Sequence, residues 1–127
     1  MAHGTARIGK DHYRTEIMVG DHSLVADEGP ALGGQAAGPA PYDLLLASLG
    51  ACTAITLRMY ADRKDWPLAS VEVGLRLAGG AGAMRIERTL KIAGLDEGQQ
   101  ARLADIAERT PVTLTLKNGL PIDTRLA

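Results

Sequence analysis

Cys52 is the only cysteine among the 127 residues, and it is the side chain with the greatest intrinsic nucleophilic potential. It lies in an apolar run, directly after Gly50 and Ala51. A free cysteine in such a run usually behaves as a small buried hydrophobic residue. A position within a helix also keeps the thiol away from the positive end of that helix's own dipole. A reactive Cys52 would therefore need a cation, such as an arginine or a lysine, that reaches it from another element.

The other polar side chains do not form the patterns of a metal site or of a serine nucleophile. His3, His12 and His22 have neither the His-x-x-x-His spacing nor a carboxylate at a metal-ligand offset. Ser48 lacks the first glycine of a nucleophile elbow. We therefore expect no bound metal and no serine-based hydrolysis.

The charge of the chain is nearly balanced, with 14 basic and 15 acidic residues and a pI near 6.3. Binding to phosphate backbones draws on a basic excess, and base stacking needs aromatic rings, which make up only 3% of this chain. No nucleic-acid partner is expected, and Arg85 and Arg88 are interpreted as an exposed surface pair.

Length and cysteine usage predict the organisation of the chain and its compartment. With 127 residues and no separating linker, residues 1–127 are expected to form one domain. The single cysteine excludes an internal disulfide, and residues 1–5 contain no apolar signal core. A cytoplasmic location is the expectation.

The first forty residues predict a β-hairpin followed by a long loop. Tyr13–Val19 and Ser23–Ala26 have the composition of strands, and the Gly-containing segment between them predicts a turn. Gly29–Ala40 contains too many glycines and prolines for a regular element.

A long helix is predicted from Pro41, because proline suits the first helical position. From Leu44 to Ala61 apolar residues occupy every side of a helical wheel, so this helix should be buried on most of its surface. Arg58 and the charged residues 62–65 argue against a membrane span. Because the rest of the chain is too small to surround the helix, we expect a second copy to cover its exposed face, in a homodimer.

A second hairpin and a second helix follow. Apolar and polar residues alternate in Val71–Leu77 and in Met84–Ile92, which predicts a sheet with one packed face. Asp96 and Gln99 have the capping-box spacing, so a helix is predicted from there to about Arg109.

The last segment allows two interpretations. Pro111 either ends the second helix or begins a new one with Thr110 as its cap, while the periodicity also permits a strand over Val112–Leu116. Leu120–Leu126 is predicted to be a closing strand.

The segment Gly38–Thr53 resembles the first catalytic segment of the OsmC/Ohr family, with a Gly-rich loop, a proline-containing pair and a long helix that carries Ala51-Cys52. The Leu57–Ala61 segment, the hairpin, the second helix and Thr110-Pro111-Val112 follow in the order of that family, so the resemblance covers nearly the whole chain. It implies an α+β fold with two antiparallel sheets built from β-hairpins around a long buried central helix. It also implies an intertwined homodimer.

The resemblance further implies a thiol peroxidase that reduces organic hydroperoxides, with Cys52 as the peroxidatic residue. The cation of the family comes from the first hairpin, where Arg14 is the best candidate and Lys10 the second. The resolving cysteine of the two-cysteine pattern corresponds to Thr110, which cannot resolve a sulfenic acid. An external thiol, and no bound cofactor, is therefore expected to restore Cys52.

Two functions remain open at this point. The first is a one-cysteine hydroperoxide reductase that acts in oxidative-stress defence. The second is a non-catalytic protein of the same fold that binds a lipid or another small apolar molecule, or that senses oxidants through Cys52. In either case the pocket is expected to be apolar. Its expected lining residues are Tyr42, Asp43, Ser48, Leu49, Ile55, Thr56 and Thr110.

Overall fold

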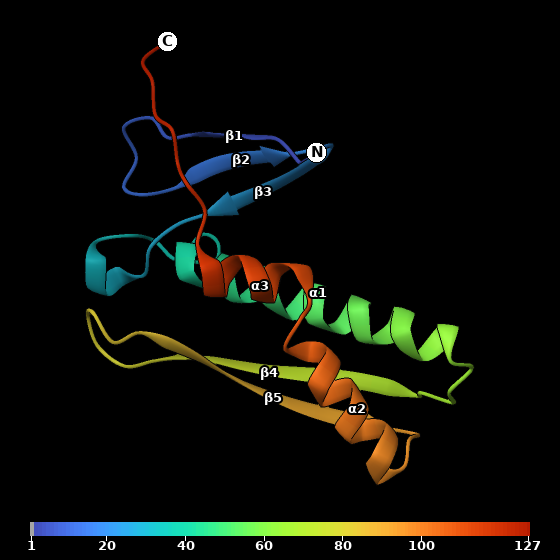
Figure 1. Ribbon diagram of the computed structural model, residues 1–127. Helices are drawn as coiled ribbons and strands as arrows, with labels where there is room; N and C mark the ends of the chain where they lie inside the picture. The colour runs from blue at the N-terminus through green and yellow to red at the C-terminus, as the bar shows by residue number, and fades with distance from the viewer. Residues whose placement is uncertain (1) are drawn as a thin grey trace. The chain divides into compact units, whose positions relative to one another are not determined.

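The computed structural model describes residues 2–127, and it has the α+β architecture that the sequence predicts, with two antiparallel sheets and one long helix (Figure 1). The chain divides into two compact units, Met1–Leu45 and Leu46–Ala127. The expectation of a single domain stays a prediction, and each unit is described by itself.

The first unit contains a three-stranded antiparallel sheet in the order β1-β2-β3, formed by Gly4–Arg7, Thr15–Val19 and His22–Ala26. The predicted hairpin is β2 and β3, in which Val19 pairs with His22 across a two-residue turn. Gly20 in this turn has a φ of 58°, which a residue with a side chain rarely adopts. β1 adds a strand that the sequence analysis did not separate from its surroundings.

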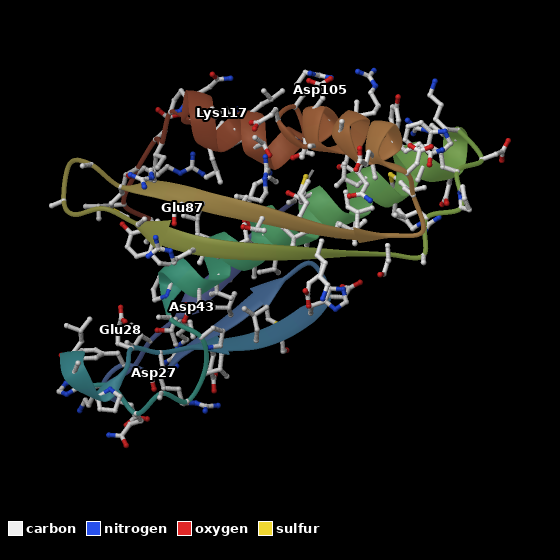
Figure 2. The ribbon with its side chains drawn as sticks, turned by 90° about the horizontal axis from the view of Figure 1, so that it is seen from below. Asp27, Glu28, Asp43, Glu87, Asp105 and Lys117 are labelled. Carbon is white, nitrogen blue, oxygen red and sulfur yellow. The ribbon has the colours of Figure 1, made fainter. Side chains whose placement is uncertain are left out.

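The predicted loop is ordered around the buried carboxylate of Asp27, which is 2% exposed (Figure 2). Its Oδ1 accepts hydrogen bonds from the backbone amides of Tyr13 at 3.0 Å and Glu28 at 2.7 Å. Its Oδ2 accepts from the amides of Gln35 at 3.3 Å and Ala37 at 3.1 Å. Burial raises the pKa of Asp27, but these four hydrogen bonds together outweigh it, so the pKa lies below its ordinary value. One short 3₁₀ helix, Pro30–Leu32, lies within the loop.

The long helix α1 spans Pro41–Arg63, as predicted from the position of Pro41. In the single chain α1 is buried along one side and exposed elsewhere, and the expected coverage of its exposed face by a second copy stays a prediction. Ile55 and Met59 are 54% and 52% exposed. The buried positions recur every fourth residue and form one stripe: Leu49, Thr53, Leu57 and Ala61. By length and composition α1 could also cross a membrane, but the core helices of soluble proteins satisfy the same criterion.

In the second unit, the antiparallel strands β4 (Ser70–Ala78) and β5 (Arg85–Ala93) run alongside α1, and α2 (Glu97–Ala107) and α3 (Pro111–Asn118) follow (Figure 1). The alternating exposure of β4 confirms the predicted face of the hairpin. Residues of α1, of the segment before β4 and of α2 form the core: Leu57, Ala61, Leu68, Leu103 and Ala107.

The predicted capping box at the start of α2 is confirmed. The amide of Gln99 donates to Asp96 Oδ1 at 2.8 Å, and the amide of Asp96 donates to Gln99 Oε1 at 3.1 Å. Two otherwise unpaired amides of the first turn and the cap are satisfied in this way.

The C-terminal segment decides between the two interpretations of the sequence. Val112–Leu116 is helical and not a strand, because Thr110 takes an extended conformation as N-cap and Pro111 occupies the first turn of α3. The predicted strand over Leu120–Leu126 is wrong, since these residues have no regular structure. Pro121 lacks the amide hydrogen that pairing would use, and no strand within residues 2–127 pairs with this segment.

Candidate active site around Cys52

Cys52 lies on α1 with its side chain half-buried, and its sulfur meets a hydrogen-bond donor from a distant part of the chain. The backbone amide of Val112 donates to Cys52 Sγ at 3.5 Å. The hydroxyl of Thr56, one turn further along α1, lies 4.0 Å from the same sulfur. Both groups can donate a hydrogen bond to the sulfur.

The donor belongs to the first turn of α3. Thr110 is its extended N-cap, Pro111 has no amide hydrogen, and Val112 therefore presents the first N–H of the helix. First-turn amides have no partner within their own helix, and the helix dipole places partial positive charge there. The positive helix end at the sulfur therefore comes from α3 and not from the helix that carries Cys52.

Arg88 on β5 is not the exposed residue that the sequence analysis expected, because only 13% of its side chain is exposed. Its Nη1 donates to the hydroxyls of Thr53 at 3.0 Å and Thr113 at 2.9 Å. Its Nη2 donates to the carbonyl oxygen of Ala107 at 2.8 Å. The guanidinium thus joins β5 to α1, to the end of α2 and to α3. Arg85, three residues earlier, is exposed as expected and pairs with Glu87.

A signal for this burial was present in the sequence. In the alternating pattern of β5, Ile86, Leu90 and Ile92 face the core, and Arg88 occupies the same phase between Ile86 and Leu90. It pairs in register with the core-facing Leu75 of β4. An arginine in the apolar phase of a strand predicts either a partnered buried charge or a wrong register.

Three threonine hydroxyls accompany the guanidinium. Thr53 and Thr110 are fully buried and Thr113 is 5% exposed. Thr53 donates to the carbonyl of Leu49 at 2.7 Å, and the hydroxyls of Thr110 and Thr113 lie 2.6 Å apart. Among the described residues no buried side-chain nitrogen or oxygen atom lacks a hydrogen-bond partner. The cluster is therefore a fully satisfied polar network, which fixes the elements that it joins.

The outer edge of this network is charged. Glu108 Oε2 lies 3.9 Å from Arg88 Nη2 and accepts a hydrogen bond from Lys117 Nζ at 2.8 Å. The hydrogen bond and the charge of Lys117 hold the pKa of Glu108 below its ordinary value, and Arg88 contributes less. The carboxylate therefore stays ionised beside the guanidinium at neutral pH.

The structure brings some of the predicted pocket residues to Cys52. Thr56 lies next to the sulfur, and Thr110 begins the turn whose amide contacts it. Leu49 belongs to the buried stripe of α1, whereas Ile55 is exposed on another side of the helix. Ser48 precedes Cys52 by one helical turn and is exposed.

Four predicted site residues lie in the first unit, and their roles at Cys52 stay predictions. Arg14 Nη2 lies 3.8 Å from Glu16 Oε1, at a surface hollow of about 480 Å³ over the sheet. Lys10 and Tyr42 are exposed. Asp43, in the first turn of α1, accepts a hydrogen bond from the Ala40 amide at 3.0 Å. Among residues 2–127 no cluster of three or more His, Cys, Asp or Glu side chains has the arrangement of a metal site.

The fold and the site define an α+β protein whose single cysteine lies on a long helix and faces the start of another. A family model described as OsmC-like protein matches residues 33–125. The chain therefore belongs to the OsmC-like protein family, which confirms the predicted resemblance.

Solved structures share this fold. An OsmC-like protein from Mycoplasma pneumoniae matches with a TM-score of 0.78 and 18% identity, over 92% of this chain and 87% of that one. An organic hydroperoxide resistance protein OsmC from Legionella pneumophila matches with a TM-score of 0.67 and 21% identity, over 92% of this chain and 89% of that one. An organic hydroperoxide resistance protein from Elizabethkingia anophelis matches with a TM-score of 0.68 and 18% identity, over 93% of this chain and 89% of that one. A search of curated proteins finds no match.

Proposed function

We propose that this protein reduces organic hydroperoxides, with Cys52 as its single peroxidatic cysteine and an external thiol as reductant. The observation that carries the proposal is the hydrogen bond from the Val112 amide to Cys52 Sγ, which offers a thiolate a donor at a helix N-terminus. Membership of the OsmC-like family supports it, as do the two structural relatives described as organic hydroperoxide resistance proteins.

The chemistry has three steps. The Cys52 thiolate attacks the terminal oxygen of the hydroperoxide, so that an S–O bond forms while the O–O bond breaks. Two electrons pass from sulfur to the peroxide, Cys52 becomes a sulfenic acid, and the departing alkoxide takes a proton to give the alcohol. One external thiol then condenses with the sulfenic acid and releases water. A second external thiol attacks the mixed disulfide, which restores Cys52 and releases the oxidised reductant.

Residues outside the second unit have proposed parts in this scheme. Arg14, or else Lys10, would stabilise the thiolate and the departing alkoxide, and Tyr42 and Asp43 would contact the substrate at the start of α1. An apolar pocket would favour alkyl or lipid hydroperoxides over hydrogen peroxide. We also propose a homodimer in which a second copy covers the exposed face of α1, where Ile55 and Met59 are about half exposed.

The test is the consumption of cumene hydroperoxide by the purified protein, with dihydrolipoamide and dithiothreitol compared as reductants. Multiple turnovers that vanish in Cys52→Ser are expected, with a higher kcat/KM than for hydrogen peroxide. Thr115→Ser on α3 serves as a matched control that leaves the contacts of Cys52 in place. The absence of turnover with either reductant would contradict the proposal.

A second candidate function is oxidant sensing or the binding of a small apolar molecule. One observation favours it: the hydroxyl of Thr110, the residue that corresponds by family resemblance to the resolving cysteine, is buried against Thr113 and cannot resolve a sulfenic acid. Under this alternative, Cys52 would consume one equivalent of hydroperoxide and then stay oxidised in the presence of both dithiols. Intact-mass measurement of the sulfenic acid, trapped with dimedone, separates this result from turnover.

A further inference from the structure

We infer that Arg88 is a positioning residue for Cys52: it holds the first turn of α3 against α1, so that the Val112 amide faces the sulfur. The inference rests on the proposed role of Cys52 as the reactive thiol. Arg88 would act through the backbone of α3 and would not itself touch the substrate.

The geometry of the two contacts carries the inference. Arg88 Nη1 donates to Thr53, the residue directly after Cys52, at 3.0 Å. The same nitrogen donates to Thr113, the residue directly after Val112, at 2.9 Å. One atom therefore ties α1 to α3 at the positions adjacent to the two members of the sulfur–amide contact.

The second guanidinium nitrogen fixes the approach to α3. Arg88 Nη2 donates to the carbonyl of Ala107, the last residue of α2. Only Glu108, Arg109 and Thr110 separate this carbonyl from Pro111. Thr113 donates to the same carbonyl at 3.2 Å, which closes the connection between the two helices. The start of α3 is thus held from both sides.

Arginine suits this position better than any other side chain. Its planar fork can donate to several acceptors in fixed directions, whereas lysine is a flexible point charge. A buried charge is weak evidence for stability, because a well-packed apolar residue at the same place is often as stable. The other core-facing residues of β5 are apolar. The presence of an arginine among them is therefore explained by its hydrogen bonds, which position α1 and α3. The charged groups that face it are Glu108 at the end of α2 and, through Glu108, Lys117 on α3.

The rate of Cys52 alkylation by iodoacetamide, measured from pH 5 to pH 9, tests the inference, because only the thiolate reacts. The most informative pair is Thr113→Val and Thr113→Ser. The valine variant removes the hydroxyl that receives Arg88 but keeps the arginine charge, and the serine variant keeps both. We expect Thr113→Val to alkylate about three- to tenfold more slowly at pH 7, with the profile displaced to higher pH, and Thr113→Ser to resemble the wild type.

Arg88 variants provide the second half of the test. Arg88→Met should show the same displacement as Thr113→Val, and Arg85→Met, on the exposed phase of β5, should show none. Arg88→Lys keeps the charge but not the fork, so it should stay close to Arg88→Met. Circular dichroism and the thermal midpoint establish that each variant is folded. If Arg88→Met does not fold, the Thr113 pair decides.

Two results would overturn the inference: a wild-type alkylation profile in folded Thr113→Val, or full rescue by Arg88→Lys, which would leave only a role for charge. Alkylation requires no hydroperoxide, so the result is separable from the proposed function. A displaced profile without peroxide turnover would keep the role of Arg88 and reject the peroxidase. Peroxide turnover in variants whose alkylation profiles match the wild type would support the peroxidase and reject the positioning role of Arg88.

Discussion

The backbone amide of Val112 lies 3.5 Å from the sulfur of Cys52, although sixty positions separate the two residues in the chain. The contact joins the middle of α1 to the first turn of α3. A thiol in the middle of a helix cannot use that helix's own positive end, but here a second helix supplies one. If Cys52 is the reactive thiol that we propose, its reactivity should depend on how firmly α3 is held, and the hydrogen bonds of Arg88 join α3 to α1.

The Val112 contact predicts a coupled titration. Because the Val112 amide donates to the sulfur, its hydrogen bond should strengthen when the thiol loses its proton. In ¹H–¹⁵N spectra the Val112 amide should move downfield with rising pH, with the same midpoint as Cys52 alkylation. Cys52→Ser removes the titrating group and should abolish the movement. A Val112 amide that does not titrate in the wild type would contradict the contact.

Thr53→Val should lower the free energy of unfolding by about 1–3 kcal/mol, because the fully buried hydroxyl accepts from Arg88 and its loss leaves a charged donor with one acceptor fewer. The valine has nearly the same shape, so packing changes little. Urea unfolding at pH 7 measures the difference. Thr89→Val, on the exposed phase of β5, is the control and should change stability by less than about 0.5 kcal/mol. Equal losses in the two variants would mean that the Arg88 network contributes nothing specific.

Local signals in the sequence were sufficient for most elements. Three signals act within a few residues, and each predicted its element: Pro41 the start of α1, the Asp96 and Gln99 pair the start of α2, and the alternation of apolar residues the strand β4. The contacts of Cys52 with Val112 and of Arg88 with Thr113 join residues that are 60 and 25 positions apart. No local pattern encodes such distances, so the sequence indicated Cys52 as a candidate but not the amide that contacts its sulfur.

The closing segment shows a different limit. Leu120, Ile122 and Leu126 occupy alternate positions, interrupted only by Thr124, which resembles the pattern of a strand. Yet Ile122 and Leu126 are 87% and 98% exposed. A strand needs a partner edge as well as a pattern, and no strand within residues 2–127 supplies one to this segment. Periodicity predicts which face of a segment is apolar, and it does not predict what that face meets.

Asp27 predicts a specific acid sensitivity. Burial raises the pKa of Asp27, but its four amide hydrogen bonds lower it below the ordinary value of 3.8. A carboxyl group whose pKa is lower in the folded state contributes stability in full above its unfolded pKa, and this contribution is lost as the pH falls through the folded value. Asp27→Asn should therefore be less stable than the wild type at pH 7, with a thermal midpoint lower by roughly 5 °C.

The difference between Asp27→Asn and the wild type should begin to shrink as the pH falls below about 4, because the unfolded carboxyl then takes up a proton, and it should vanish once the pH passes the lower folded pKa. Thermal unfolding at pH 7, 5, 4 and 3 gives the two curves. Glu108→Gln is a useful comparison, since the pKa of that exposed carboxyl is lowered chiefly by Lys117, whose pairing is screened by solvent. It should change the thermal midpoint little at any pH. Parallel curves for Asp27→Asn and the wild type would reject the role of the four amides.

Thr110→Cys should convert the proposed one-cysteine site into one that resolves itself. Thr110 begins the turn whose Val112 amide contacts Cys52, and the family resemblance places the resolving cysteine at Thr110. One equivalent of cumene hydroperoxide should first form the sulfenic acid at Cys52, and the new thiol should then condense with it, releasing water and forming an intramolecular disulfide. Intact mass should fall by two hydrogens, and both thiols should become inert to iodoacetamide. Thr115→Cys, five residues further along the chain in α3, should instead keep a free thiol beside an oxidised Cys52. If Thr110→Cys behaves like Thr115→Cys, then the start of α3 does not approach Cys52 closely enough for resolution.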